Sequence, residues 1–242
     1  MSNPAWMNRE WLAQRLAAAH GMPALVPGDV RVAPPEQPDA AAPMAAAVGA
    51  GASVAVGIPA DITFERARTP AAVLVPLVAR PAGITVLLTQ RAAHLARHAG
   101  QIAFPGGRHE PADGTPVITA LRETEEEVGL SRTHVQVLGL LPQYRTRTGY
   151  VITPVVGWIE PPFDLAPDPG EVADVFEMPL AFALDAANHQ RHFRDAGGER
   201  RYFYVLPYQD RYIWGATAAM LVNFHHLLGS SGTRPGHRDA AE

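Results

Sequence analysis

A helix whose two ends are both marked in the sequence constrains the fold more than any other segment. Thr115 and Pro116 are residue types that typically cap and open a helix, and Gly129 is typical of a helix stop. We therefore predict a helix over residues 116–128. Because β-rich runs precede and follow it, this helix has to pack against a sheet, which places the chain among the mixed α and β folds.

Runs rich in β-forming residues predict the strands of that sheet. Residues 71–80 and 84–91 form two such runs separated by a Pro/Gly turn, which is the pattern of a hairpin. Residues 92–114 are irregular and rich in Gly and Pro. The remaining predicted elements are strands over 134–143, 151–159 and 201–206 and a helix over 216–228. Together these elements describe one α/β or α+β domain, to which we assign residues 61–229.

The two ends of the chain differ from this domain in composition. Residues 7–19 predict a short amphipathic helix with Asn8 as its N-cap. Ala, Pro and Gly then dominate up to residue 59, so little apolar surface is available to offset the entropy of ordering the chain. We expect residues 1–60 to form a helix and an extended linker arm, and residues 230–242 to form a disordered tail.

The composition excludes several classes of function. Cysteine and lysine are both absent, which excludes disulfides, cysteine-ligated metals and the lysine of a Walker A site. A formal net charge of -4 without a basic block argues against duplex nucleic acid as a partner. The charge-free stretch between Asp39 and Asp61 holds few large apolar side chains, so we expect no membrane span. A chain without cysteine needs no oxidising compartment, and we expect it in the cytoplasm.

Three glutamates face one side of the central helix. Glu123, Glu126 and Glu127 stand at i, i+3 and i+4, whereas Glu125 points elsewhere. Like charges at this spacing destabilise a helix, and a divalent cation bound by hard oxygen ligands would reverse that effect. Arg122 could orient one of the carboxylates or bind a phosphate. For such an acidic run taken alone, a solvated helix face is the alternative.

The loop before this helix and the end of the helix together resemble a known family. FPGG at residues 104–107 precedes the helix, and RETEEEVGL at residues 122–130 closes it. This pattern is similar to the box of the Nudix hydrolases, GX5EX7REUXEEXGU. Two features depart from the box: Thr124 replaces a bulky apolar residue, and one extra residue precedes the arginine, which leaves Asp113 as the first acidic position. The resemblance implies a Nudix-type α/β/α sandwich with a mixed sheet.

Upstream segments narrow the resemblance to one subgroup. LLTQRA at residues 87–92 and HAGQ at residues 98–101 look like the LLTxR and HxGQ signatures of the coenzyme A pyrophosphatases. TRTGY at residues 146–150 and IWGATA at residues 213–218 resemble further segments of that subgroup. One arginine that the subgroup usually carries is replaced here by Ala96. The likeness covers roughly residues 70 to 226 and leaves the N-terminal region outside.

This resemblance implies hydrolysis of the diphosphate bond of coenzyme A or acyl-CoA, which gives 4'-phosphopantetheine and adenosine 3',5'-bisphosphate. It implies Mg²⁺ or Mn²⁺ as the cofactor and a small nucleotide-like molecule as the partner. The implied catalytic residues are Glu123, Glu126, Glu127 and Arg122, with Glu123 as the candidate general base. The implied metal ligands are the same three glutamates, the Gly106 carbonyl and Glu171. The implied substrate contacts are Arg91, Arg97, His98, Gln101 and Arg147.

Several alternatives stay open from the sequence. The substrate could instead be ADP-ribose or another nucleoside diphosphate derivative, or the domain could bind a nucleotide without cleaving it. Glu171 could also be a surface carboxylate. The histidines are scattered, and His94 and His98 would share a face only on a helix, so we expect no zinc site. The preference between free coenzyme A and acyl-CoA stays open, and so does a homodimer.

Overall fold

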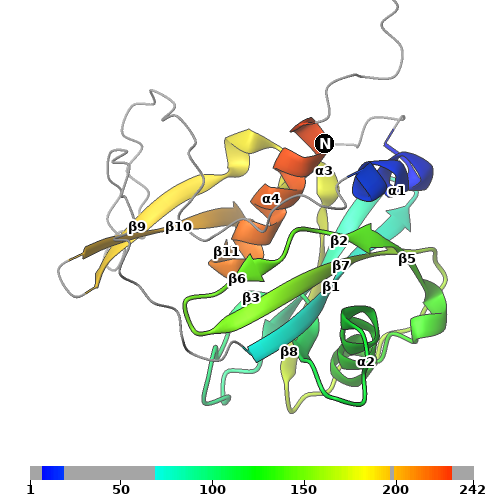
Figure 1. Ribbon diagram of the computed structural model, residues 1–242, viewed down its shortest axis with the longest axis horizontal. Coiled ribbons are helices and arrows are strands. Elements are labelled where there is room, and N and C mark those ends of the chain that lie inside the picture. Colours follow the sequence, from blue (N-terminus) through cyan, green and yellow to red (C-terminus); the bar gives the residue numbers. More distant parts are fainter. Residues whose placement is uncertain (1–6, 19–68, 197–198, 231–242) are drawn as a thin grey trace, which may run out of the picture.

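A mixed sheet with helices on both faces forms the body of the protein (Figure 1). The computed structural model describes residues 7–18, 69–196 and 199–230. The helices are α1 (Arg9–Ala18), α2 (Pro116–Val128), α3 (Leu180–Ala183) and α4 (Ala216–Ser230), with short 3-10 turns at Arg132–His134 and Ala186–Asn188. The main sheet contains β1 (Thr69–Arg80), β2 (Gly83–Arg91), β3 (Ile102–Ala103), β4 (Gly106–Arg108), β5 (Val135–Leu140), β6 (Tyr144–Arg145), β7 (Tyr150–Ile159) and β8 (Val172–Pro179). A second sheet contains β9 (Gln190–Ala196), β10 (Glu199–Tyr208) and β11 (Arg211–Trp214).

The long strand β1 lies at the centre of the main sheet. The order along the sheet is β3-β2-β1-β7-β5, with β4 also paired to β1, β6 to β7 and β8 to β2. Strands β1 and β7 run parallel, in register from the Thr69–Tyr150 pair to the Val78–Ile159 pair. The chain between these two parallel strands contains α2, which covers one face of the sheet.

Both faces of β1 are buried, which explains its almost continuous apolar sequence. Ala72 and Leu74 pack with Ala120 of α2 on one face. Val73 and Val75 point to the opposite face, where they join a larger cluster that includes residues of α1 and α4. The resulting three-layer α/β/α arrangement with a mixed sheet confirms the fold class predicted from the sequence.

The N-terminal helix α1 packs onto the main sheet. Leu12 and Leu16 are fully buried in the cluster that lies between β1 and α4. The Asn8 side chain accepts a hydrogen bond from the Trp11 backbone N–H at 2.9 Å, which confirms the predicted N-cap. A Cβ added at Gly139 of β5 would lie 2.8 Å from Leu16 Cβ, so the missing side chain lets strand and helix approach closely. The domain boundary at residue 60 stays a prediction.

Most of the longer elements lie where the sequence predicts them: the hairpin β1–β2, the helices α2 and α4, and the strands β5, β7 and β10. The sequence does not predict β8, β9 and β11, nor the short elements β3, β4, β6 and α3, of which β3 and β4 lie in the stretch 92–114 that it treats as irregular. Strand β9, QRHFRDA, is mostly polar, and its strand conformation is set by pairing with β10 rather than by apolar alternation. The predicted linker arm, the charge-free stretch and the predicted tail beyond Ser230 lie outside the described residues. Among the helices that the structure describes, none is long and apolar enough to cross a membrane.

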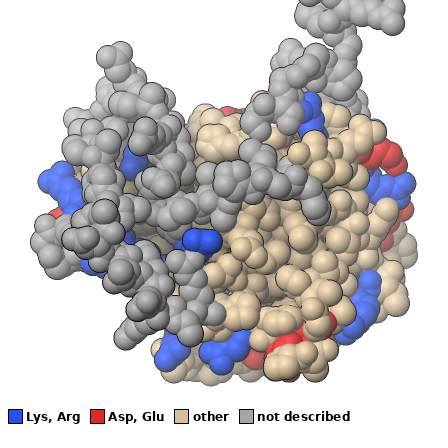
Figure 2. Space-filling view, viewed as in Figure 1, with Lys and Arg blue, Asp and Glu red and all other residues tan. Residues whose placement is uncertain are grey.

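Charges of both signs are interspersed on the visible surface. On the face shown in Figure 2, acidic side chains and arginines lie next to one another over the region of α2. Arginines therefore balance part of the negative charge of α2. The contacts of each glutamate show which carboxylates keep an unbalanced charge.

Candidate active site

Helix α2 is fixed at both ends, as the sequence predicts. The Thr115 side chain accepts a hydrogen bond from a backbone N–H of the first turn at 3.3 Å. Gly129 ends the helix in the left-handed region at φ 68°, a conformation that favours glycine. The chain then returns to the helix end, where the Asp168 N–H donates to the Glu127 carbonyl at 2.9 Å. These contacts fix the direction in which the last turns of α2 point their side chains.

Glu127 is the most buried carboxylate of the predicted set, with 6% of its side chain exposed. One oxygen accepts a hydrogen bond from the Gly106 N–H at 3.1 Å, and the other lies 3.5 Å from Arg91 Nη1. Burial raises the pKa of Glu127 to about 7, and repulsion from Glu171 and Glu123 adds to the rise, while Gly106 and Arg91 oppose it. The charge on this carboxylate is therefore only partly compensated.

Glu123 lies one turn earlier on α2, against the loop that precedes the helix. A Cβ added at Gly107 would fall 2.4 Å from the Glu123 carboxyl carbon, so the glycine leaves the space that this carboxylate occupies. Arg122 Nη2 donates to Glu123 at 3.0 Å. Burial raises the pKa of Glu123 against the opposing effect of Arg122, and repulsion from Glu126 and Glu171 adds to the rise.

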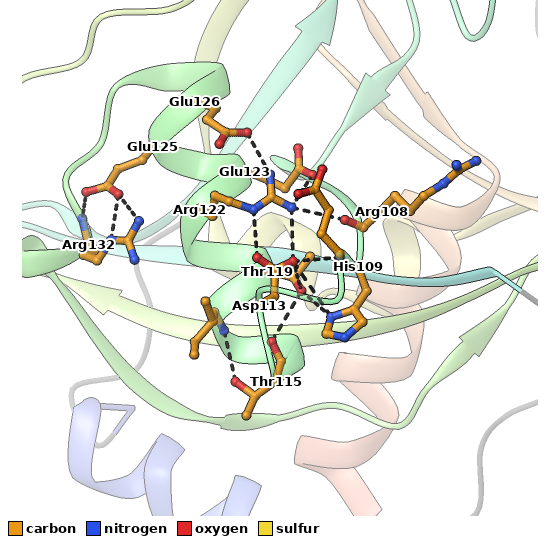
Figure 3. Close-up of polar contacts among 12 residues, drawn as sticks. Arg108, His109, Asp113, Thr115, Thr119, Arg122, Glu123, Glu125, Glu126 and Arg132 are labelled. Atoms are coloured by element: carbon orange, nitrogen blue, oxygen red, sulfur yellow. Dashed lines mark hydrogen bonds and ion pairs between the residues drawn. The ribbon is translucent and has the colours of Figure 1, made fainter.

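Arg122 connects the helix to the loop before it (Figure 3). It donates to Asp113 through Nε at 2.9 Å and Nη2 at 3.1 Å, to Glu126 through Nη1 at 2.8 Å, and to the Arg108 carbonyl through Nη2 at 3.2 Å. These hydrogen bonds from Arg122, together with the Glu110 N–H, hold the pKa of the buried Asp113 carboxyl well below its usual range. In this structure Arg122 orients carboxylates, and Asp113, which the box alignment marks only as the first acidic position, anchors it.

The other residues of the acidic run point away from this network. Glu125 lies on the opposite side of the helix and accepts a hydrogen bond from Arg132 Nε at 2.7 Å, which confirms its predicted orientation (Figure 3). Thr124 occupies the position where the box has an apolar residue, and it is buried. Its hydroxyl donates to the Ala120 carbonyl at 2.6 Å, so burying this polar side chain leaves no unpaired donor.

Glu171 stands in the loop before β8, beside Arg91. Its carbonyl accepts the Ala92 N–H at 2.8 Å, and its own N–H donates to the Asp168 carbonyl at 3.0 Å. Its half-exposed side chain lies 4.0 Å from Arg91 Nη1. Its charge adds to the raised pKa of both Glu123 and Glu127.

The loop predicted to contact substrate lies beside Arg91. The Arg91 N–H donates to the Gln101 carbonyl at 3.0 Å. His98 adopts a positive φ of 57°, which is uncommon for a residue with a side chain, and its Nδ1 lies 2.7 Å from Gln101 Oε1. The backbone of β2 and this histidine together hold Gln101 beside Arg91.

The remaining predicted site residues do not join the cluster. Arg97 and Arg147 are exposed, and within the part of the chain that the structure describes no ion pair connects either to a carboxylate. No helix contains both His94 and His98, and His94 instead lies 3.1 Å from the Gly170 carbonyl through Nε2.

The donor set fits a divalent cation by type and charge. Carboxylate oxygens are the ligands that Mg²⁺ and Mn²⁺ prefer. Burial raises the pKa of Glu123 and Glu127, repulsion from neighbouring carboxylates adds to the rise, and a bound cation would offset both costs. Among residues 7–18, 69–196 and 199–230, however, no three His, Asp or Glu side chains are already arranged as a metal cage. Glu126 is turned toward Arg122, and Gly106 contacts Glu127 through its N–H. The ligands would therefore have to close around the ion.

Comparisons with known proteins match the segment that carries these residues. The family description "NUDIX domain" matches residues 68–197. An uncharacterized Nudix hydrolase NudL of Photorhabdus laumondii is 44% identical over 153 residues, covering 62% of this chain and 80% of that protein. NudL of Escherichia coli K12 is 43% identical over 151 residues, covering 62% of this chain and 78% of that protein. Among solved structures, a Nudix hydrolase from M. Smegmatis, RenU, superimposes with a TM-score of 0.48 and 19% identity, covering 70% of this chain and 91% of that chain.

The buried charge of Glu127 predicts a specific pH dependence of stability. Because folding raises its pKa from 4.5 to about 7, Glu127 contributes stability that is complete below pH 4.5 and is lost as the pH rises through 7. With EDTA present, Glu127→Gln should therefore be more stable than the wild type at pH 8, on the order of 2 kcal/mol, with the difference vanishing near pH 4.5. Urea unfolding at both pH values measures this.

Glu125→Gln is the matched control on the other side of the same helix. Hydrogen bonds from Arg132 lower the pKa of Glu125, so its charge stabilises the fold above pH 4.5, and this variant should be slightly less stable than the wild type at pH 8. If Glu127→Gln were as stable as the wild type at pH 8, or less stable, Glu127 would not carry an under-compensated charge.

Proposed function

Because the chain belongs to the NUDIX domain family, we propose that it is a metal-dependent pyrophosphatase whose substrate is coenzyme A or an acyl-CoA. The observation that carries the proposal is Glu127, a carboxylate buried at the end of α2 among other carboxylates and only partly compensated by Arg91. A fold rarely retains such a group for stability, since burying a charge is costly unless it is paired. Charge perturbation of this kind is typical of functional sites.

The metal would be held by the carboxylates at the end of α2. Glu123, Glu126 and Glu127 would be its ligands, with Glu171 and the Gly106 carbonyl completing the set. A bound Mg²⁺ or Mn²⁺ supplies Lewis-acid polarisation of a phosphoryl oxygen and lowers the pKa of a bound water.

The protein's own groups then orient the reactants and move the proton. Glu123 is the candidate general base, because burial raises the pKa of its carboxyl and so makes it a better proton acceptor near neutral pH. Arg122 is hydrogen-bonded to Glu123 and Asp113, so it ties the candidate base to the loop before the helix while the substrate binds.

The choice of coenzyme A is supported by the contacts of three segments that resemble the subgroup. The LLTxR-like segment ends at Arg91, whose backbone is bonded to Gln101 of the HxGQ-like segment. Gly106 of the FPGG segment donates to Glu127. Two of the segments therefore contact Glu127, and the third contacts Arg91. ADP-ribose or another nucleoside diphosphate derivative is the alternative substrate.

Removing one ligand charge should stop the reaction while leaving the fold intact. Glu126→Gln and Glu127→Gln should each lower kcat for coenzyme A by about a hundredfold or more at saturating Mg²⁺, whereas Glu125→Gln should keep near wild-type turnover. Product quantification by mass spectrometry measures this, and circular dichroism checks the fold. EDTA should abolish activity without unfolding the domain. Near wild-type activity in either of the first two variants would place the metal site elsewhere.

The 3'-phosphate that coenzyme A carries and dephospho-coenzyme A lacks provides the test of substrate class. A guanidinium bound to this phosphate is worth a factor of about ten to a hundred in kcat/KM. Arg97, which stands beside the position where the subgroup has arginine, is the exposed candidate. We expect the wild type to prefer coenzyme A over dephospho-coenzyme A, Arg97→Ala to reduce this preference, and the control Arg132→Ala to keep it. Equal kcat/KM for both substrates in the wild type would leave a broader nucleoside diphosphate hydrolase.

A further inference from the structure

A register shift in the main sheet orients the side chain of Arg91. Along the β2–β8 ladder, Gln90 pairs with Asp174 but Arg91 pairs with Val172, so the register shifts at this point and Ala173 is left out. A bulge of this kind bends the strand and redirects the side chains beside it. The Arg91 backbone is fixed on its other edge by hydrogen bonds with the Gly100–Gln101 loop. The strand pairing of β2 therefore determines the position of Arg91.

The redirected side chain lies between two carboxylates of the proposed metal site. Arg91 Nη1 is 3.5 Å from Glu127 Oε1 and 4.0 Å from Glu171 Oε2. Within the described residues Arg91 is the only arginine or histidine that forms an ion pair with Glu127. Both distances are longer than those of a hydrogen-bonded pair, and 27% of the Arg91 side chain is exposed, so the guanidinium is attracted to the carboxylates but not locked onto them.

We propose that Arg91 is the resident counter-ion of Glu127 and Glu171 in the metal-free protein, and that the divalent cation displaces it when the carboxylates close around the ion. This inference rests on the proposed function. It gives Arg91 a positioning role in addition to the substrate contact predicted from the sequence.

The displacement follows from electrostatics. A guanidinium and a divalent cation at the same carboxylate repel one another strongly at separations of a few ångströms in a half-buried site. A long arginine side chain with one edge already in solvent can swing outward at little cost. The freed guanidinium would then lie at the mouth of the site, where an anionic diphosphate binds, so metal binding would prepare the protein for its substrate.

Metal affinity measured without substrate distinguishes this role from a substrate contact. In Arg91→Gln the cation no longer competes with a guanidinium, so the Kd for Mn²⁺, measured by isothermal titration calorimetry, should fall about tenfold. The metal-free variant should also have a lower Tm than the wild type, because Glu127 and Glu171 lose their counter-ion, and its gain in Tm on adding Mn²⁺ should be larger. Arg91→Lys keeps the positive charge, so its Kd for Mn²⁺ should stay near the wild-type value. The same variant shows whether the fold tolerates a replacement at position 91.

Arg132→Gln, which removes an arginine from the opposite side of the same helix, is the control and should leave the Kd unchanged. An unchanged Kd in Arg91→Gln would overturn the inference and leave Arg91 as a substrate contact alone. A raised Kd would also overturn it, because Arg91 would then assist the metal. If instead the wild type bound no Mn²⁺ and hydrolysed no diphosphate, the proposed function itself would fail.

Discussion

The cost of burying a carboxylate governs the organisation of this protein. Glu127 lies almost completely out of solvent, and its partners in the described structure are one backbone N–H and one loosely placed arginine. Removing a charge from water costs several kcal/mol unless it is paired, and a like-charged neighbour adds to that cost. Much of the surrounding structure holds the Glu127 carboxylate in place although its burial costs free energy.

The contacts that position Glu127 come from segments that are far apart in the sequence. Packing of α2 on β1 fixes the helix axis, while Thr115, Gly129 and the Asp168 loop fix its ends. The glycines of the preceding loop contribute in two ways, because Gly106 donates an N–H and Gly107 leaves space for a second carboxylate. None of these contacts is chemically unusual by itself. Their convergence brings carboxylates together at one end of α2, where we propose that a divalent cation binds.

The sequence predicts the local elements well and the long-range contacts poorly, for a physical reason. The bounds of α2 follow from Thr115, Pro116 and Gly129, because capping is a local interaction. The outward orientation of Glu125 follows from helical periodicity. By contrast, the pairing of Asp113 with Arg122 depends on how the loop folds back, and the aim of Arg91 depends on a register shift against β8, a strand that local patterning does not predict. Arg97 and Arg147 are predicted by resemblance alone, and resemblance carries no information about distance.

The cation that these residues would hold can be located directly. Crystals of the protein soaked in Mn²⁺ can be measured at the manganese absorption edge. The proposed site predicts an anomalous peak in contact with the Glu123 and Glu127 carboxylates, with the Arg91 guanidinium moved away from Glu127. A peak elsewhere on the chain, or no peak at saturating Mn²⁺, would contradict the assignment of this cluster as the metal site.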